Sequence, residues 1–263
     1  MEGRFDTAIT ELQLSADEVI ATINALDLYS RVWVGHVSHL DMELRMHRLT
    51  FEDPTRSKQT EDLLVAMRSI FLPECAGCGA AMNLGIWNER TCELAVCAYD
   101  MQQVIRHDWS WFCHPEGGLT RWFDVPFLRG SMPAPETACL YDDHGEPIMR
   151  IRLAREPLHL LLDALLAHQA LLDVRLSDMM GLFTRDGHVL TIARILEGLY
   201  LEYPQHGHTG PSDADGTLAD LCDRIALALG TPTDDSYRTL ALECADRCDP
   251  LTFGERCPKE CYR

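Results

Sequence analysis

The sequence has no apolar stretch long enough to cross a lipid bilayer, and its N-terminus has no basic segment followed by an apolar one. We therefore expect a cytoplasmic protein that is neither secreted nor inserted in a membrane. Lysine is scarce, and the basic residues form no run. Because the formal net charge is −18 at pH 7, we expect no direct binding to nucleic acid, and the charge suits a protein partner with a basic surface. The alternative is that the negative charge only keeps the protein soluble.

The motifs of several large enzyme classes are also missing. The chain contains no Gly-x-x-x-x-Gly-Lys-Ser/Thr phosphate loop, no Gly-x-Gly-x-x-Gly, no Gly-x-Ser-x-Gly and no His-Glu-x-x-His. These absences make catalysis less expected without excluding it.

The most informative pattern that is present is an apolar stripe that occurs twice. Its spacing is typical of a long amphipathic helix with one apolar face. The first stripe consists of Val19, Ile23, Leu26, Trp33, Val37, Leu40 and Leu44, and the second, at a constant offset, of Leu158, Leu162, Leu165, Leu172, Leu176, Met179 and Phe183. Polar Ser30 and Gln169 fall at matching places. This agreement favours an internal duplication over two amphipathic helices that are alike by chance.

Each stripe belongs to a similar series of elements. The first half is predicted to contain a strand at 6–14, a helix from the Ser15/Glu18 capping box to about Met46, a helix with Leu63, Met67, Ile70 and Phe71 on one face, and a helix at 91–112. The second half is predicted to contain a strand at 148–153, a helix at 155–183, a helix with Ile192, Leu196, Leu199 and Tyr200, and a helix at 217–229. A strand at 120–127 and a polar connection at 131–147 lie between them.

The expected fold class is α+β, mostly helical, with a small sheet. Residues 1–130 are expected to form the first repeat unit, residues 148–232 the second unit, and residues 233–263 a cysteine-rich tail. The two apolar faces would pack together near a pseudo-twofold axis, with the strands pairing at one end, so that the repeats form one compact domain.

The tail has the strongest metal-ligand spacing in the chain, Cys244-x3-Cys248 followed by Cys257-x3-Cys261. Four thiolates in two close pairs suit a closed, tetrahedral, structural zinc site. Two disulfides or four free thiols are the alternatives, and disulfides are uncommon in a reducing compartment.

A second cysteine set contains Cys75-x2-Cys78 and Cys92-x4-Cys97. The first pair has the spacing of half a zinc site. The second pair fits less well, because five residues along a helix turn two side chains about 140° apart. Cys75 and Cys78 are therefore candidate zinc ligands, and the alternative is a loop of small residues.

His36, His39 and Glu43 recur at helical spacing beside the first apolar stripe. Two imidazoles and a carboxylate in one row could hold a catalytic metal ion that keeps an open coordination position. The alternative is a solvated helix face.

The segment from Ala98 to His107 places Asp100, Arg106 and His107 on one predicted helix. Arg106 could bind a carboxylate or phosphate, and Asp100 could orient His107. The favoured alternative is a set of internal hydrogen bonds that join this helix to the first long helix.

The stretches Leu26–Gly35 and Ala98–His107 resemble patterns found in short uncharacterised proteins of phages and bacteria. The resemblance covers about a third of the chain and excludes the cysteine tail. It implies a phage-encoded or accessory protein that works by binding, and it assigns no functional residue.

These observations favour an acidic protein-binding inhibitor or regulator, for example a phage protein that occupies a basic, nucleic-acid-binding surface of a host complex. The first alternative is a metal-dependent enzyme that uses His36, His39 and Glu43. The second is a zinc-stabilised structural module that forms a homodimer.

We predict that the intact protein contains zinc, held by the four tail cysteines, and that the metal is lost when residues 233–263 are removed. Elemental analysis with a thiol count checks this. Zinc that survives removal of the tail and disappears on His36→Ala would instead support the enzyme interpretation.

Overall fold

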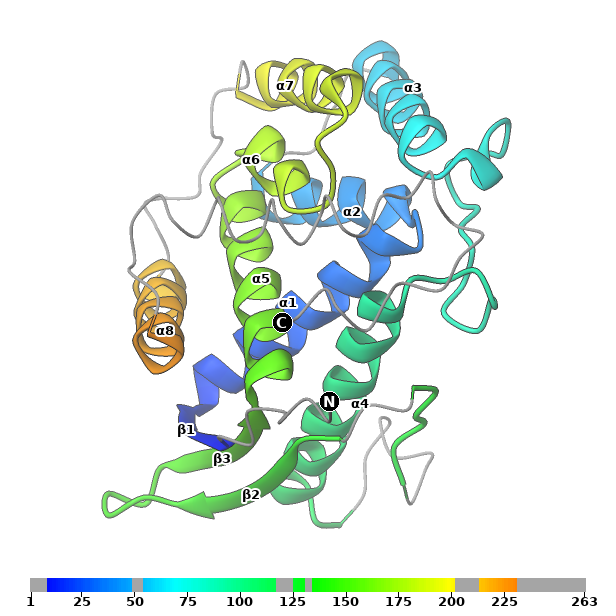
Figure 1. The fold of residues 1–263 in the computed structure, drawn as a ribbon. Coiled ribbons are helices and arrows are strands. Elements are labelled where there is room, and N and C mark those ends of the chain that lie inside the picture. The colour runs from blue at the N-terminus through cyan, green and yellow to red at the C-terminus, as the bar shows by residue number, and fades with distance from the viewer. Residues whose placement is uncertain (1–8, 49–53, 117–124, 131–133, 202–212, 231–263) are drawn as a thin grey trace.

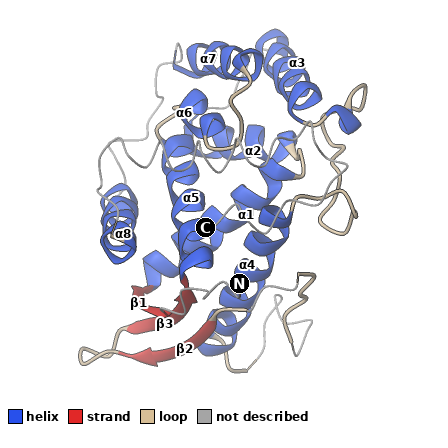
Figure 2. Cartoon of the chain, in the orientation of Figure 1, coloured by secondary structure: helices blue, strands red, loops and turns tan. Residues whose placement is uncertain are grey.

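The structure is a computed structural model that describes residues 9–48, 54–116, 125–130, 134–201 and 213–230. In these ranges, helices stand over one three-stranded sheet (Figures 1 and 2), in agreement with the α+β class predicted. The elements are β1 (Ile9–Ser15), α1 (Ala16–Trp33), α2 (Val37–Arg48), α3 (Pro54–Phe71), the 3-10 helix η1 (Pro73–Cys75), α4 (Glu93–Cys113), β2 (Glu136–Tyr141), β3 (Pro147–Ala154), α5 (Arg155–Leu172), α6 (Leu176–Gly181), α7 (Gly187–Leu201) and α8 (Asp213–Leu229). None of the helices in these ranges has the length and apolarity that a bilayer span requires.

β3 lies at the centre of the sheet and pairs antiparallel with β1 on one side and β2 on the other. Leu12 of β1 is directly opposite Ile151 of β3, and both side chains are buried beneath the helices. The other face of the sheet is exposed, and there Arg152 lies 2.7 Å from Glu136 and 3.9 Å from Glu11. Alternation of apolar and polar residues thus gives the sheet one face in the core and one in solvent.

The polar connection predicted at 131–147 is wrong, because β2 occupies part of it. β2 and β3 form a hairpin whose turn is stabilised by Asp142, which accepts hydrogen bonds from the backbone N–H of His144 and of Glu146, both at 2.8 Å. The polar residues of this segment include a turn that joins two paired strands. Of the strand predicted at 120–127, residues 120–124 lie outside the described residues, and residues 125–127 are not in a strand.

The first long helix begins where it was predicted to begin but does not run to Met46. The capping box is confirmed: Ser15 N–H donates to the Glu18 carboxylate at 2.7 Å, and Glu18 N–H donates to Ser15 Oγ at 3.4 Å. The helix then ends at Trp33, and α2 starts at Val37 as a separate helix. The break follows from Gly35, which has φ +75°, a left-handed conformation typical of the residue after a helix end.

The second long helix breaks in the same way, between α5 and α6. In α1, the N–H groups of Gly35 and His36 donate to the carbonyls of Val32 and Arg31. In α5, the N–H groups of the corresponding Val174 and Arg175 donate to the carbonyls of Leu171 and Ala170. Both sets have the pattern of a Schellman motif. The second is unusual because Val174, a β-branched residue, has φ 57°, which costs about 1–2 kcal/mol.

The core lies where the two halves meet. α1 packs against α4 and α5, and α5 packs against α8 (Figure 1). Tyr29 and Trp33 of α1, Phe71 of α3 and Phe183 after α6 form one aromatic cluster, with ring centroids of neighbouring pairs 5.0 to 6.5 Å apart. All members of the two apolar stripes are buried or packed against the core, so the predicted inward faces are confirmed.

We predict that Gly35→Ala lowers the free energy of unfolding by about 1–2 kcal/mol, because an alanine at φ +75° is strained and its Cβ would lie 2.7 Å from Leu72 Cδ1. Gly198→Ala is the control, since Gly198 lies in α7 with open space around its Cα. That substitution should stabilise the protein by about 0.5–1 kcal/mol. Urea unfolding measures both, and a Gly35→Ala variant as stable as the parent would contradict the assignment.

Candidate functional site

The three residues predicted as catalytic metal ligands lie at the junction of α1 and α2. His36 is in the turn, whereas His39 and Glu43 are on α2. The expectation that all three share one continuous helix is wrong, because α1 ends before His36. The turn nevertheless brings the two imidazole rings together, with centroids 5.8 Å apart.

Two residues of α1, Asp27 and Arg31, complete this cluster. Arg31 Nε donates to Asp27 Oδ2 at 2.6 Å, and Arg31 Nη1 lies 3.0 Å from His36 Nδ1. His39 Nε2 lies 3.5 Å from Asp27 and 3.6 Å from the Glu43 carboxylate. Asp27 was not singled out from the sequence, although its spacing of one helical turn from Arg31 is the usual signal for such a pair.

The two imidazoles of this cluster are neutral at neutral pH. Burial lowers the pKa of His36 and of His39, and the nearby Arg31 guanidinium lowers both further. The Asp27 carboxylate raises the pKa of both rings, and the Glu43 carboxylate raises that of His39, each with a smaller effect. Because a guanidinium can only donate, the Nδ1 atom of His36 accepts from Arg31 and the ring carries its proton on Nε2.

A metal ion would have to compete with Arg31 for His36 and Asp27. Within the described part of the chain, no three His, Cys, Asp or Glu side chains are arranged to hold a metal ion together. Cys75 is buried and Cys78 is partly buried, and both are free thiols. The four tail cysteines predicted as zinc ligands lie outside the described residues: Cys244, Cys248, Cys257 and Cys261.

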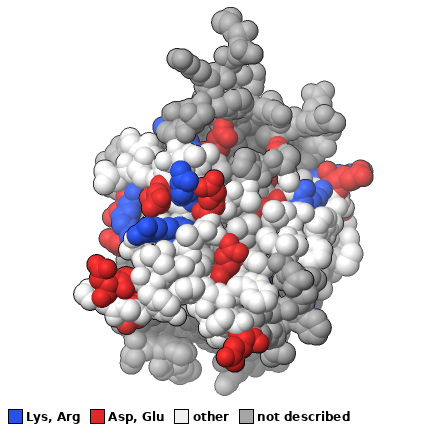
Figure 3. Space-filling view, turned by 90° about the horizontal axis from the view of Figure 1, so that it is seen from below, with Lys and Arg blue, Asp and Glu red and all other residues white. Residues whose placement is uncertain are grey.

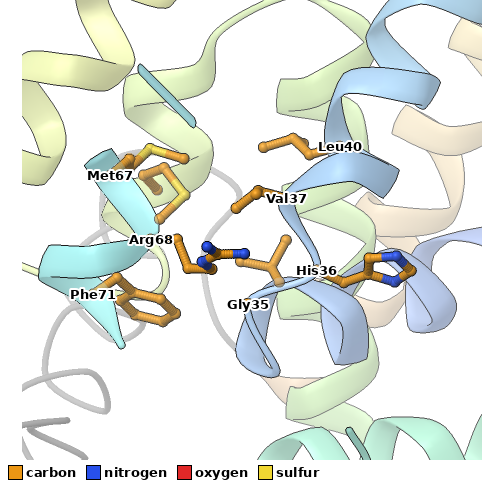
Figure 4. A pocket seen from close by; sticks show the side chains of 9 residues that line it. Gly35, His36, Val37, Leu40, Met67, Arg68 and Phe71 are labelled. Atoms are coloured by element: carbon orange, nitrogen blue, oxygen red, sulfur yellow. The ribbon is translucent and has the colours of Figure 1, made fainter. Parts of the chain in front are cut away.

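An apolar pocket lies beside the same junction, between α2 and α3 (Figure 4). It is small and partly open to solvent, with a volume of about 20 Å³, and its lining includes Val37, Leu40 and Phe71. Figure 4 shows that the imidazole of His36 points away from the pocket, so this ring does not place an acid or base inside it. The pocket has room for about one water-sized group and offers no catalytic pair.

Arg68 lies at the edge of this pocket and is 1% exposed. Its guanidinium donates to backbone carbonyls of the loop after η1: Cys78 at 2.6 Å, Gly79 at 3.1 Å, Ala80 at 3.4 Å and Met82 at 2.5 Å. Several carbonyl dipoles thus share one buried positive charge. This side chain fixes the start of a loop that has no secondary structure of its own.

Asp100 fixes a second loop, which corrects its predicted role. Its carboxylate accepts hydrogen bonds from the N–H of Arg129 at 2.8 Å and of Gly130 at 2.6 Å, and it does not orient His107. His107 instead lies 2.8 Å from Asp108. The favoured alternative, that the 98–107 segment bonds to the first long helix, is also wrong for Asp100, because its partners are in the 125–130 loop. No sequence signal links residues so far apart.

Arg129 joins this loop to the one that follows η1. Its guanidinium donates to the carbonyls of Ile86 and Asn88, the latter at 2.6 Å. These two carbonyls lie on either side of Trp87, so the segments around Trp87 and around Arg129 are neighbours. Both lie beside α4 in Figure 1.

The two joined loops carry an exposed apolar surface, here called the Trp87 surface. It consists of Trp87, Val125, Phe127 and Leu128, which are 58%, 68%, 48% and 42% exposed. All four belong to the two segments that Arg129 joins, and large exposed apolar side chains on neighbouring segments are candidates for an interaction site. The sequence patterns did not identify these residues: Val125 and Phe127 fall in the strand predicted at 120–127, and Trp87 and Leu128 belong to no predicted element.

Asp163 of α5 is an ionisable group that the sequence analysis missed. Burial raises the pKa of this carboxyl to about 7. No hydrogen bond or ion pair joins it to another residue in the described ranges, so its charged form has little compensation. On the sequence it is one acidic residue that lies between two positions of the second apolar stripe, and it gives no signal of its own.

Comparison of the chain with protein-family models, with curated proteins and with solved structures gives no match.

We predict that Asp163→Asn makes the protein more stable at pH 8 than the parent. The carboxyl has a higher pKa in the folded than in the unfolded chain, so the folded protein binds the proton more tightly. The free energy of unfolding that this gives is fully present at low pH and is lost as the pH rises toward 7. The shift corresponds to at most about 4 kcal/mol, and we expect about 2 because the side chain keeps partial contact with solvent.

Urea unfolding at pH 5 and pH 8 measures this difference. Asp143→Asn, at an exposed position in the β2–β3 turn, is the control and should change little at either pH. Equal stability of the parent and the Asp163→Asn variant at pH 8 would argue against a buried carboxyl.

Proposed function

We propose that this is a binding protein with no catalysis of its own, and that the Trp87 surface contacts its protein partner. One observation carries this proposal: polar side chains that are buried or partly buried hold the loops on which the exposed apolar residues lie. A carboxylate that is 5% exposed, that of Asp100, binds two backbone N–H groups. This arrangement presents Trp87 and its neighbours in one shape before a partner arrives, which reduces the entropy cost of binding.

Gly130 supports the same proposal. A Cβ atom added at Gly130 would lie 2.7 Å from the Asp100 carboxylate, so a larger residue there would displace the carboxylate that binds the loop. The loop is therefore held by contacts that depend on its sequence.

The partner that we propose has a basic surface around an apolar contact. The formal net charge of −18 would attract such a surface over long distances and speed association. The acidic groups do not gather into one patch on the face shown in Figure 3, where arginines and carboxylates are intermixed. Charge would therefore steer the encounter, and the Trp87 surface would supply the contact. A phage-encoded inhibitor of a nucleic-acid-binding host complex is one form of this proposal.

We also propose that the fold is an internal duplication. The matching helix breaks at Gly35 and Val174 support it, as does the pairing of Leu12 with Ile151, its own counterpart at the same offset. α4 packs on α1 as α8 packs on α5. A pair of related units that meets at corresponding residues has the arrangement of an isologous dimer.

The enzyme alternative rests on the clustering of His36 and His39 with Asp27 and Glu43. It would require a metal ion to displace Arg31 from His36. Elemental analysis of the His36→Ala variant separates this alternative from the binding proposal, because binding through the Trp87 surface needs no metal at the α1–α2 junction.

We predict that the double substitution Trp87→Ala/Phe127→Ala lowers retention of the partner by at least about tenfold, since exposed aromatics at the centre of a contact carry much of the binding energy. The immobilised parent, the double variant and Leu227→Ala are compared in extracts by quantitative mass spectrometry. Leu227 is the matched control, because it is 81% exposed on α8 and outside the Trp87 surface.

A partner that fits the proposal is basic, is released by salt, and is retained equally by the parent and by Leu227→Ala. Equal retention by all three proteins would overturn the assignment of the surface. Binding that is indifferent to salt would overturn the role of charge. A dimer of the parent that is absent from the double variant, seen by light scattering, would identify a second copy of the chain as the occupant.

A further inference from the structure

Cys75 and Cys78 lie at the first and fourth positions of one β-turn. The N–H of Cys78 donates to the carbonyl of Cys75 at 3.2 Å. Between them, Ala76 has φ −60° and ψ 136°, and Gly77 has φ +76°. These angles define a type II turn, in which the first and fourth Cα atoms lie less than about 7 Å apart. A disulfide needs nearly the same Cα separation, about 4.4–6.8 Å.

The backbone conformation of the turn requires glycine at position 77, whereas the space around that position does not. A Cβ atom at Gly77 would meet nothing within 4 Å. The third position of a type II turn requires a positive φ, which glycine adopts without strain. The sequence Cys-Ala-Gly-Cys therefore specifies both the turn and the approach of the two thiols.

The turn is held on both sides. Cys75 N–H donates to the carbonyl of Leu72 at 2.9 Å, and the Cys78 carbonyl accepts from Arg68 Nη2 at 2.6 Å. Cys75 is 4% exposed, whereas Cys78 is only partly buried and Ala76 and Gly77 are exposed. A reagent from solution therefore reaches Cys78 first, and Cys75 lies behind it.

We propose that Cys75 and Cys78 are a reversible dithiol–disulfide pair that is oxidised by low-molecular-weight disulfides such as glutathione disulfide. The Cys78 thiolate attacks one sulfur of the oxidant, forms a mixed disulfide and releases one glutathione thiolate. The Cys75 thiolate then attacks Cys78 Sγ, closes the Cys75–Cys78 bond and releases the second glutathione thiolate. The two thiol protons go to the two released thiolates, so two thiols are oxidised and one disulfide is reduced.

The surroundings favour this order of attack. Burial raises the pKa of the Cys75 thiol, and the nearby Arg68 guanidinium offsets part of that effect. Cys75 is therefore a poor first nucleophile toward a reagent in solution. Cys75 attacks only after the mixed disulfide has formed on Cys78. The closeness of the two groups then raises the rate and offsets the low reactivity of the Cys75 thiol. The oxidised turn begins the loop that carries Trp87.

The test uses the full-length folded protein, incubated with glutathione disulfide, quenched in acid, alkylated and digested with trypsin. Cleavage after Arg68 and Arg90 releases peptide 69–90, in which the only cysteines are Cys75 and Cys78. We expect this peptide to carry no alkyl groups and to be lighter than the reduced, unalkylated peptide by the mass of two hydrogen atoms. Dithiothreitol should reverse the change. The next peptide, 91–106, is an internal control.

Peptide 91–106 contains Cys92 and Cys97, five residues apart at the start of α4, and Cys97 is buried. We expect no disulfide in it. The variant Cys75→Ser should stop at a glutathione adduct on Cys78, and Cys78→Ser should leave Cys75 unmodified.

Three results would overturn the proposal. The first is a peptide 69–90 that carries two alkyl groups after oxidation, and the second is a peptide 69–90 that carries two glutathione adducts. Protection of its thiols could be removed by a chelator and not by a reductant, which would assign them to a metal ion. Gly77→Ala gives a further check, because a strained turn should shift the product from the closed disulfide toward the mixed disulfide on Cys78.

Discussion

The antiparallel pairing of β1 with β3 is the contact on which the rest of this structure depends. It joins the N-terminal strand to one in the second half of the chain, with Leu12 and Ile151 opposite each other and buried. Each strand leads directly into a long helix, so the pairing also sets α1 and α5 side by side over the inner face of the sheet. The aromatic cluster around Trp33 then closes the other end of the interface. Hydrophobic burial along this interface is the main favourable term in folding.

Loops in this protein gain their shape from side chains that bind backbone groups. Arg68 and Arg129 donate to carbonyls of the 76–91 loop, and Asp100 accepts from N–H groups of the 125–130 loop. Burying a charge is costly unless it is well hydrogen-bonded, and a helix or strand would satisfy the same backbone groups with neutral partners. These charged side chains fix the exposed loops that carry the Trp87 surface, on which the proposed binding function depends. Arg68 also fixes the turn that holds Cys75 and Cys78, the proposed redox pair.

The sequence was most informative where a pattern is local or periodic. The Ser15/Glu18 capping box and the two apolar stripes depend on neighbours within a few residues, and the structure confirms them. Gly35 is a residue type that commonly follows a helix end, but the continuous stripe predicts one helix across it, and the structure has two. Val174 gives no such signal, because its left-handed conformation is imposed by the surrounding fold. The partners of Asp100 could not be foreseen, since they depend on a loop far along the chain.

The most direct test of the central contact is a double-mutant cycle between Leu12 and Ile151. The free energy of unfolding in urea is measured for the parent, Leu12→Ala, Ile151→Ala and the double variant. Each single substitution should cost about 2–4 kcal/mol as a large-to-small change in a core. If the two side chains are opposite each other as the register places them, the double variant should lose about 1 kcal/mol less than the sum of the single losses. Losses that add without any coupling would contradict this account of the fold.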